Sequence, residues 1–74
     1  MIARDVLNTY VRAQPFRPFR IHVASGRSIE IRHPEMLVVR NNLALVFSSA
    51  TEDAWEAVSL MLMESVSYLD APVT

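Results

Sequence analysis

The residues best suited to chemistry are the two histidines of the sequence, His22 and His33, each of which has a glutamate nearby along the chain. Glu30 lies between them, and Glu35 follows His33 by two residues. Imidazole and carboxylate groups could bind a metal ion or transfer protons. Strand alternation, however, directs His22 and His33 to opposite faces unless a bend redirects one of them. We therefore predict no catalytic and no metal site, with His22 on the surface and His33 stabilising a bend.

Other patterns that carry catalysis are missing from the sequence. Neither histidine is spaced from a serine and a carboxylate in a recognisable nucleophilic triad. The single glycine excludes a glycine-rich phosphate loop, and the absence of cysteine excludes disulfides and cysteine-based zinc sites. The acidic cluster of Glu52, Asp53 and Glu56 is more typical of a solvated loop than of a metal site. We expect a protein that is not an enzyme and that holds no cofactor.

The charges are unevenly distributed, although the formal net charge is only −1. All seven basic residues are arginines at or before Arg40, so residues 1–40 carry +4 (seven Arg against three acidic residues) and residues 41–74 carry −5. A nucleic-acid-binding domain usually has a net basic surface with clustered Lys and Arg. The asymmetry fits head-to-tail contact between copies of the chain at least as well.

The length of 74 residues predicts a single domain over residues 1–74, near the lower limit at which one core keeps a chain folded. Without disulfides, self-association is the remaining source of extra stability. Residues 1–14 have no apolar core of signal-peptide length. No apolar run approaches the ~20 residues needed to cross a bilayer. We therefore expect a cytoplasmic protein with no membrane partner.

Residues 3–13 are predicted to form an amphipathic helix, because apolar pairs recur every four residues. Pro15 ends the helix, since the residue before a proline avoids the helical region. A repeated Pro-Phe-Arg unit then fills the connector, residues 14–18, and begins the first strand. This unit could bind another domain as a polyproline ligand. Its place between two structured elements favours a stiff connector that packs Phe16 against the core.

Alternating apolar residues predict a first hairpin between residues 19–23 and 28–32. Partners across an antiparallel ladder share a face. A two-residue loop would place apolar Ile29 opposite polar His22, whereas a three-residue loop at residues 24–26 places apolar residues opposite one another. Gly26, the only glycine, takes the left-handed position of this turn. The predicted pairs are Phe19 with Ile31, Ile21 with Ile29, and Arg20 with Glu30.

A second hairpin is predicted between residues 36–40 and 43–47, with a tight turn at Asn41-Asn42 because Asn tolerates positive φ. His33-Pro34-Glu35 marks a bend or bulge before it. Both faces of this hairpin are apolar, so the second face must also be covered, and the N-terminal helix can cover part of one. One face carries Met36, Val38, Leu45 and Phe47, and the other carries Leu37, Val39, Ala44 and Val46.

The last segment is ambiguous from its pattern alone. The apolar residues from Ala54 to Leu62 match a helical template slightly better than a strand template. The alternative is two strands, residues 54–59 and 63–69, joined by a tight turn at residues 60–62.

Several motifs together resemble a family of small uncharacterised bacterial proteins. The resemblance rests on Pro15-Phe16-Arg17-Pro18-Phe19-Arg20-Ile21-His22, on Ser25-Gly26-Arg27, and on Arg32-His33-Pro34-Glu35. It covers residues 12–69 and departs at Ser25, where the family has Asp. In that family the segment matching residues 55–69 is a strand, a short turn and a strand, so we predict strands here. The family has no known activity.

The resemblance implies an Sm-like fold: a mainly β protein with an N-terminal α-helix followed by a five-stranded, antiparallel, strongly bent small barrel over residues 19–69 and a short tail, 70–74. Sm-like proteins often form rings by pairing their last two strands between subunits, and many bind RNA. Asn42 begins a segment similar to their third strand. Their RNA-binding residues match poorly, because Val38 stands where Asp is expected and residues 60–62 replace an Arg-Gly turn.

We therefore predict a non-enzymatic, homo-oligomeric β-barrel that acts as an interaction or scaffold module. The uncharged apolar segment 57–63 would template aggregation if it were left at a free sheet edge, so pairing with another copy is the economical solution. A lone Trp55 is expected at an end of the core or in a subunit interface. The predicted interface comprises Val58, Leu60, Met61 and Leu62, with Leu37, Val39 and Val46 as a second apolar patch.

The alternative hypothesis is an Sm-like RNA-binding protein, which the absence of lysine disfavours. Glu64 leaves two interpretations open, because its parity in the last strand is that of apolar residues. It is either a buried charge that awaits an arginine of a neighbouring copy or an edge charge that blocks sheet pairing. The residues assigned to nucleic-acid contact under the alternative are Arg20, Arg27, Arg32, Arg40 and Asn42.

Overall fold

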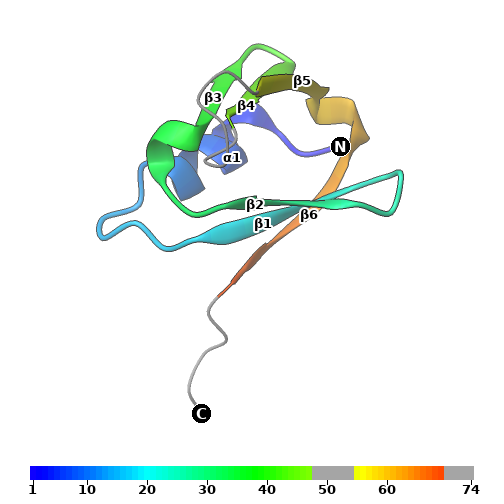
Figure 1. Cartoon of the computed structure of the whole chain (residues 1–74). Coiled ribbons are helices and arrows are strands. Elements are labelled where there is room, and N and C mark those ends of the chain that lie inside the picture. Colours follow the sequence, from blue (N-terminus) through cyan, green and yellow to red (C-terminus); the bar gives the residue numbers. More distant parts are fainter. Residues whose placement is uncertain (48–54, 70–74) are drawn as a thin grey trace.

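The computed structural model describes residues 1–47 and 55–69, which form an N-terminal helix and two antiparallel three-stranded sheets (Figure 1). This mainly β architecture with one N-terminal helix confirms the predicted fold class at that level. The elements in chain order are α1 (Arg4–Val11), β1 (Phe19–Val23), β2 (Ser28–Ile31), the 3-10 turn η1 (Pro34–Met36), β3 (Leu37–Arg40), β4 (Leu43–Phe47), β5 (Trp55–Ser59), the 3-10 turn η2 (Leu60–Leu62) and β6 (Met63–Tyr68).

The first sheet has the strand order β2-β1-β6 and contains the first predicted hairpin. Its register pairs Phe19 with Ile31 and Arg20 with Glu30, as predicted. The loop comprises residues 24–26, and the N–H of Val23 donates to the carbonyl of Arg27 at 3.0 Å. Gly26 has a φ of +92°, which residues with a Cβ seldom adopt. Turn geometry and alternation therefore determined this register.

The second sheet has the strand order β3-β4-β5. Its hairpin turns at Asn41-Asn42, and Asn41 adopts the positive φ (+50°) that a tight turn requires. The register pairs Leu37 with Val46 and Arg40 with Leu43, so the second hairpin is also confirmed. β5 then pairs with β4 along its whole length, from Trp55 opposite Phe47 to Ser59 opposite Leu43.

The prediction of five strands in a barrel needs correction. Among the described residues there are six strands in two separate sheets, and the sheets do not close into a barrel. The extra strand arises because η1 separates β2 from β3. Pro34 has no N–H to donate to a ladder, and the N–H of Met36 bonds to the carbonyl of His33 at 3.0 Å instead. The predicted bend is thus a full helical turn that ends one strand and begins another.

The last segment forms the two strands that we predicted, and the helical alternative is excluded. η2 makes the turn between them, and the hydroxyl of Ser59 accepts the N–H of Met61 at 3.3 Å. Backbone bonds fix η2 to the rest of the chain: the N–H of Leu60 donates to the carbonyl of Asn42 at 2.9 Å, and the N–H of Ala24 donates to the carbonyl of Leu62 at 2.7 Å. These contacts hold the crossing from one sheet to the other in place.

The core lies between the two sheets and α1. Its fully buried large side chains come from the helix and from the three strands of the first sheet and are Leu7, Phe19, Ile21, Ile31 and Met63. α1 contributes Leu7 as its buried residue, as its amphipathic pattern predicts. Phe16 of the connector packs against the core, with its ring 5.9 Å from that of Phe19, which confirms the connector interpretation. The predicted tail, residues 70–74, lies outside the described residues.

Candidate functional site

Four residues of the predicted interface belong to the core of the chain itself. Leu37 and Val46 are buried against the first sheet, and Val58 and Leu60 are buried beside them. Side chains inside the monomer offer no area to a second copy, so we correct their assignment to an interface. The physical reason is that a hairpin apolar on both faces does not indicate which of its faces forms the core. Val39 is half-buried and also packs against the core.

The other two residues of the predicted interface, Met61 and Leu62, are exposed to solvent. Their side chains retain 67% and 52% of their accessible surface, although both lie within η2, which is anchored by backbone hydrogen bonds. The adjacent Leu60 turns inward and is buried. A three-residue turn thus presents two large apolar side chains at the point where the chain passes between the sheets.

The outer face of the second sheet is a further apolar surface that the residue assignments above missed. Val38 and Leu43 are exposed there, and Trp55 retains 61% of its accessible surface. Cross-strand pairing aligns Val38, Leu45 and Ala57 across the three strands. The signal was present in the sequence, since these residues alternate with the buried set along β3 and β4. We call this surface the outer face, and its members are Val38, Leu43, Leu45, Phe47, Trp55 and Ala57.

Two consecutive strands each have one unpaired edge. β5 is the last strand of β3-β4-β5, and β6 is the last strand of β2-β1-β6, so each pairs on one side only within the described chain. Figure 1 shows β5 and β6 diverging from η2 into different layers. An unpaired edge presents backbone N–H and C=O groups that can bind another strand. Both edges, which η2 joins in sequence, are therefore candidate sites of association.

Glu64 lies on β6 at a β-bulge. His22 of β1 pairs with Ser65 and Val23 pairs with Met63, so Glu64 is the extra residue between them. The bulge interrupts the alternation of side chains between the two faces of β6, and Glu64 is exposed. Both interpretations of Glu64 stay open, because an edge charge and a charge that awaits an arginine of a neighbouring copy are both exposed in a single chain.

The arginines of the nucleic-acid hypothesis do not converge on one track. Arg20 and Arg32 both donate to the carboxylate of Glu30, at 2.7 and 2.8 Å. These two hydrogen bonds, with Arg20 the larger cause, hold the pKa of Glu30 below its usual value. Arg27 pairs instead with Glu56 of β5 at 2.6 Å.

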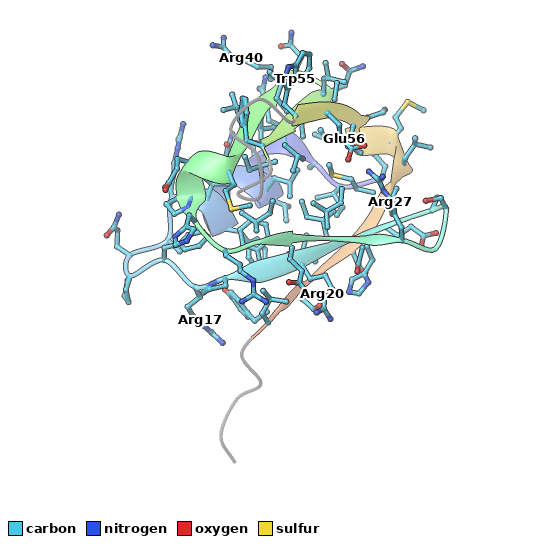
Figure 2. All side chains as sticks on the ribbon, viewed as in Figure 1. Arg17, Arg20, Arg27, Arg40, Trp55 and Glu56 are labelled. Carbon is cyan, nitrogen blue, oxygen red and sulfur yellow. The ribbon has the colours of Figure 1, made fainter. Side chains whose placement is uncertain are left out.

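Arg40 and Asn42 belong to the β3–β4 hairpin and stand apart from that cluster. Figure 2 shows Arg40 at the top of the molecule and Arg20 at the bottom. Arg40 has no carboxylate partner among the described residues, whereas Arg27 pairs with Glu56 and the two residues Arg20 and Arg32 share Glu30. The five predicted contact residues therefore do not form a contiguous basic patch.

Neither histidine forms an ion pair with a glutamate among the described residues. The Nε2 atom of His22 is 3.0 Å from the hydroxyl of Ser67 on β6, at the surface. His33 is exposed and precedes η1, where its carbonyl accepts the N–H of Met36. Residues 1–47 and 55–69 contain no group of three or more His, Asp or Glu side chains that could hold a metal ion. Glu52 and Asp53 of the predicted acidic cluster lie outside these ranges.

No protein-family model matches the sequence, and no curated protein sequence matches it. The resemblance to the small bacterial family therefore stays a prediction. In the described part of the chain, no helix is long and apolar enough to cross a membrane.

Proposed function

We propose that this chain is a non-catalytic interaction module whose copies associate through β5, η2 and β6. The observation that carries the proposal is the placement of two unpaired edges next to each other in sequence but in different sheets. β5 and β6 are separated by only the three residues of η2 and cannot satisfy each other within the chain. A second copy that brings its β6 to β5 would satisfy one edge of each copy, and repetition of the contact would satisfy the remaining edges.

Apolar surface at the same place supports the proposal. Met61 and Leu62 are exposed at the corner between the two edges, and Trp55 is exposed on β5 itself. Burying apolar surface yields about 25 cal/mol per Å² removed from water, which makes large exposed side chains next to free edges the favoured site of association. Pairing of one edge with a different edge is head-to-tail, and repeated pairing of this kind closes into a ring or extends into a filament.

The finer proposal, an Sm-like arrangement, draws support from the connectivity. β2, η1 and β3 together occupy the place of one long bent strand, and counting them as one leaves five strands behind an N-terminal helix. In this arrangement the sheets of neighbouring copies would complete one another. We favour self-association over RNA binding, because the arginines are dispersed and three of them are paired with glutamates.

The test substitutes the exposed residues of η2 and leaves the buried core residues unchanged. The double variant Met61→Glu/Leu62→Glu places two like charges where both side chains are solvent-exposed, so the monomer should fold normally. Light scattering should show that the unaltered chain is oligomeric and that the double variant is smaller. The matched control is Val6→Glu, which changes an exposed apolar residue of α1 and should leave the mass unchanged. Equal masses for the unaltered chain and the double variant would reject the proposal.

A further inference from the structure

The free edge of β2 borders a groove between the two sheets. The groove has a volume of about 480 Å³ and opens to solvent between β2 on one side and the ends of β4 and β5 on the other. The ion pair between Arg27 and Glu56 crosses it, and Figure 2 shows these two side chains approaching each other from the lower and upper layers. This groove includes no residue of η2 or β6, and β5 contributes to it only through its first two residues, Trp55 and Glu56.

Backbone groups of β2 point toward the open side. The bond from the N–H of Val23 to the carbonyl of Arg27 makes these residues a hydrogen-bonded pair. Bonded and non-bonded pairs alternate along an antiparallel ladder, so Ile29 is bonded to β1 whereas Ser28 and Glu30 are not. The N–H and C=O groups of Ser28 and Glu30 therefore face away from β1, and no described residue pairs with them. They present the hydrogen-bonding pattern that an added strand requires.

Apolar side chains from both sheets line part of the groove. Ile29, Met36 and Phe47 line it as half-buried side chains, and Trp55 lines it with most of its surface exposed. A strand added beside β2 would direct every second side chain toward these residues, because side chains alternate between the faces of a sheet. Apolar residues at those positions would cover Ile29 and Met36.

The opposite face of β2 carries excess positive charge. Arg20 and Arg32 share the single carboxylate of Glu30, which leaves a local net charge of +1 and spare guanidinium N–H donors. The remaining side chains of an added strand would lie beside this cluster. Carboxylates at those positions would bind the guanidinium groups by charge-assisted hydrogen bonds. We propose that the edge of β2 binds an extended peptide segment of alternating apolar and acidic residues as an additional strand.

The probe is a blocked hexapeptide of alternating valine and glutamate, added at a fixed protein concentration. Trp55 is the only tryptophan of the chain and borders the groove at the start of β5, so its fluorescence is expected to respond when the groove is occupied. The peptide should shift the Trp55 emission to shorter wavelength, and a peptide with lysine in place of glutamate should not. No shift at millimolar peptide would overturn the proposal.

Backbone recognition is tested by N-methylation of the probe. Methyl groups on the amides that face β2 should abolish binding, whereas methyl groups on the alternate amides should leave it unchanged. Equal binding by both methylated peptides would show that no ladder forms and would overturn the proposal. Loss of binding with only the first methylation pattern would also exclude a mode in which the side chains alone are recognised.

Charge recognition is tested by Arg32→Glu, with Arg12→Glu on α1 as the matched control. Arg32→Glu should weaken binding by about fivefold, equivalent to ~1 kcal/mol, and Arg12→Glu should not change it. An unchanged affinity in the Arg32 variant would contradict the acidic specificity. If protein concentration alone shifts the Trp55 emission and the peptide does not compete, a second copy occupies the edge and the peptide proposal fails.

Discussion

Arg27 of the first hairpin and Glu56 of β5 form an ion pair of 2.6 Å that joins the two sheets across the groove. The two residues are 29 positions apart in sequence, and no element between them connects β2 to β5 by strand pairing. The pair is therefore a side-chain link between layers that otherwise meet through the core and through η2.

The strength of this link can be measured in a double-mutant cycle with Arg27→Ala and Glu56→Ala. Both side chains are half exposed (51% and 50%), so solvent screens the pair. We expect a coupling of roughly 0.2–1 kcal/mol in the free energy of unfolding from urea titration, decreasing as salt is added. A coupling of zero at low salt would mean that the ion pair does not hold the sheets together.

Glu30 should make the stability of the fold depend on pH. Hydrogen bonds from Arg20 and Arg32 lower its pKa in the folded state, so the folded chain holds the carboxylate form more strongly than the unfolded chain. Its stabilising contribution is present above the unfolded pKa and is lost as the pH falls through the folded pKa. Urea midpoints between neutral and acidic pH should fall less in Glu30→Gln than in the unaltered chain. Identical pH profiles would contradict this assignment.

Gly26→Ala should destabilise the chain through the backbone alone. A Cβ at this position would meet no atom within 4 Å, so there is space for it, but the φ of +92° is strained for alanine. We expect a loss of about 1–2 kcal/mol in the free energy of unfolding. Gly26→Asn should cost less, because Asn tolerates the left-handed region better than alanine does. Equal stability of the alanine variant and the unaltered chain would contradict the turn geometry.

Leu60 and Met61 are neighbours with opposite expected roles. Leu60→Ala should cost ~2–5 kcal/mol of stability, because it empties a buried position. Met61→Ala should change stability by less than about 0.5 kcal/mol, because that side chain is solvent-exposed in a single copy. Thermal unfolding of both variants at low concentration makes the comparison. A larger loss for Met61 than for Leu60 would contradict the inward and outward assignment within η2.

The sequence predicts the two hairpins well, because each register depends on local chemistry. Gly26 and Asn41 are suited to positive φ, and Arg20 opposite Glu30 supports the pairing. Prediction from the sequence fails where the local residues carry no distinctive pattern. A bulge at Glu64 has no distinctive residue, and the both-sided apolar pattern of β3 and β4 does not show that Leu37 and Val46 face the core while Val38 faces water. The choice of face depends on what packs against it.

The groove beside β2 could not be predicted for a different reason. Ile29 and Trp55 are far apart in sequence, and they line one groove only because η1 turns the chain from the first sheet into the second. The pattern around Pro34 indicated a bend but not its angle. A site formed between two layers depends on that angle, whereas a hairpin does not.

The mass of the unaltered chain in solution tests the central claim most directly. Sedimentation equilibrium over a range of protein concentrations, starting in the low micromolar range, should give a multiple of the chain mass of 8.4 kDa. A mass of one chain at every concentration would contradict the account, because the edges of β5 and β6 would then stay unpaired in a soluble protein.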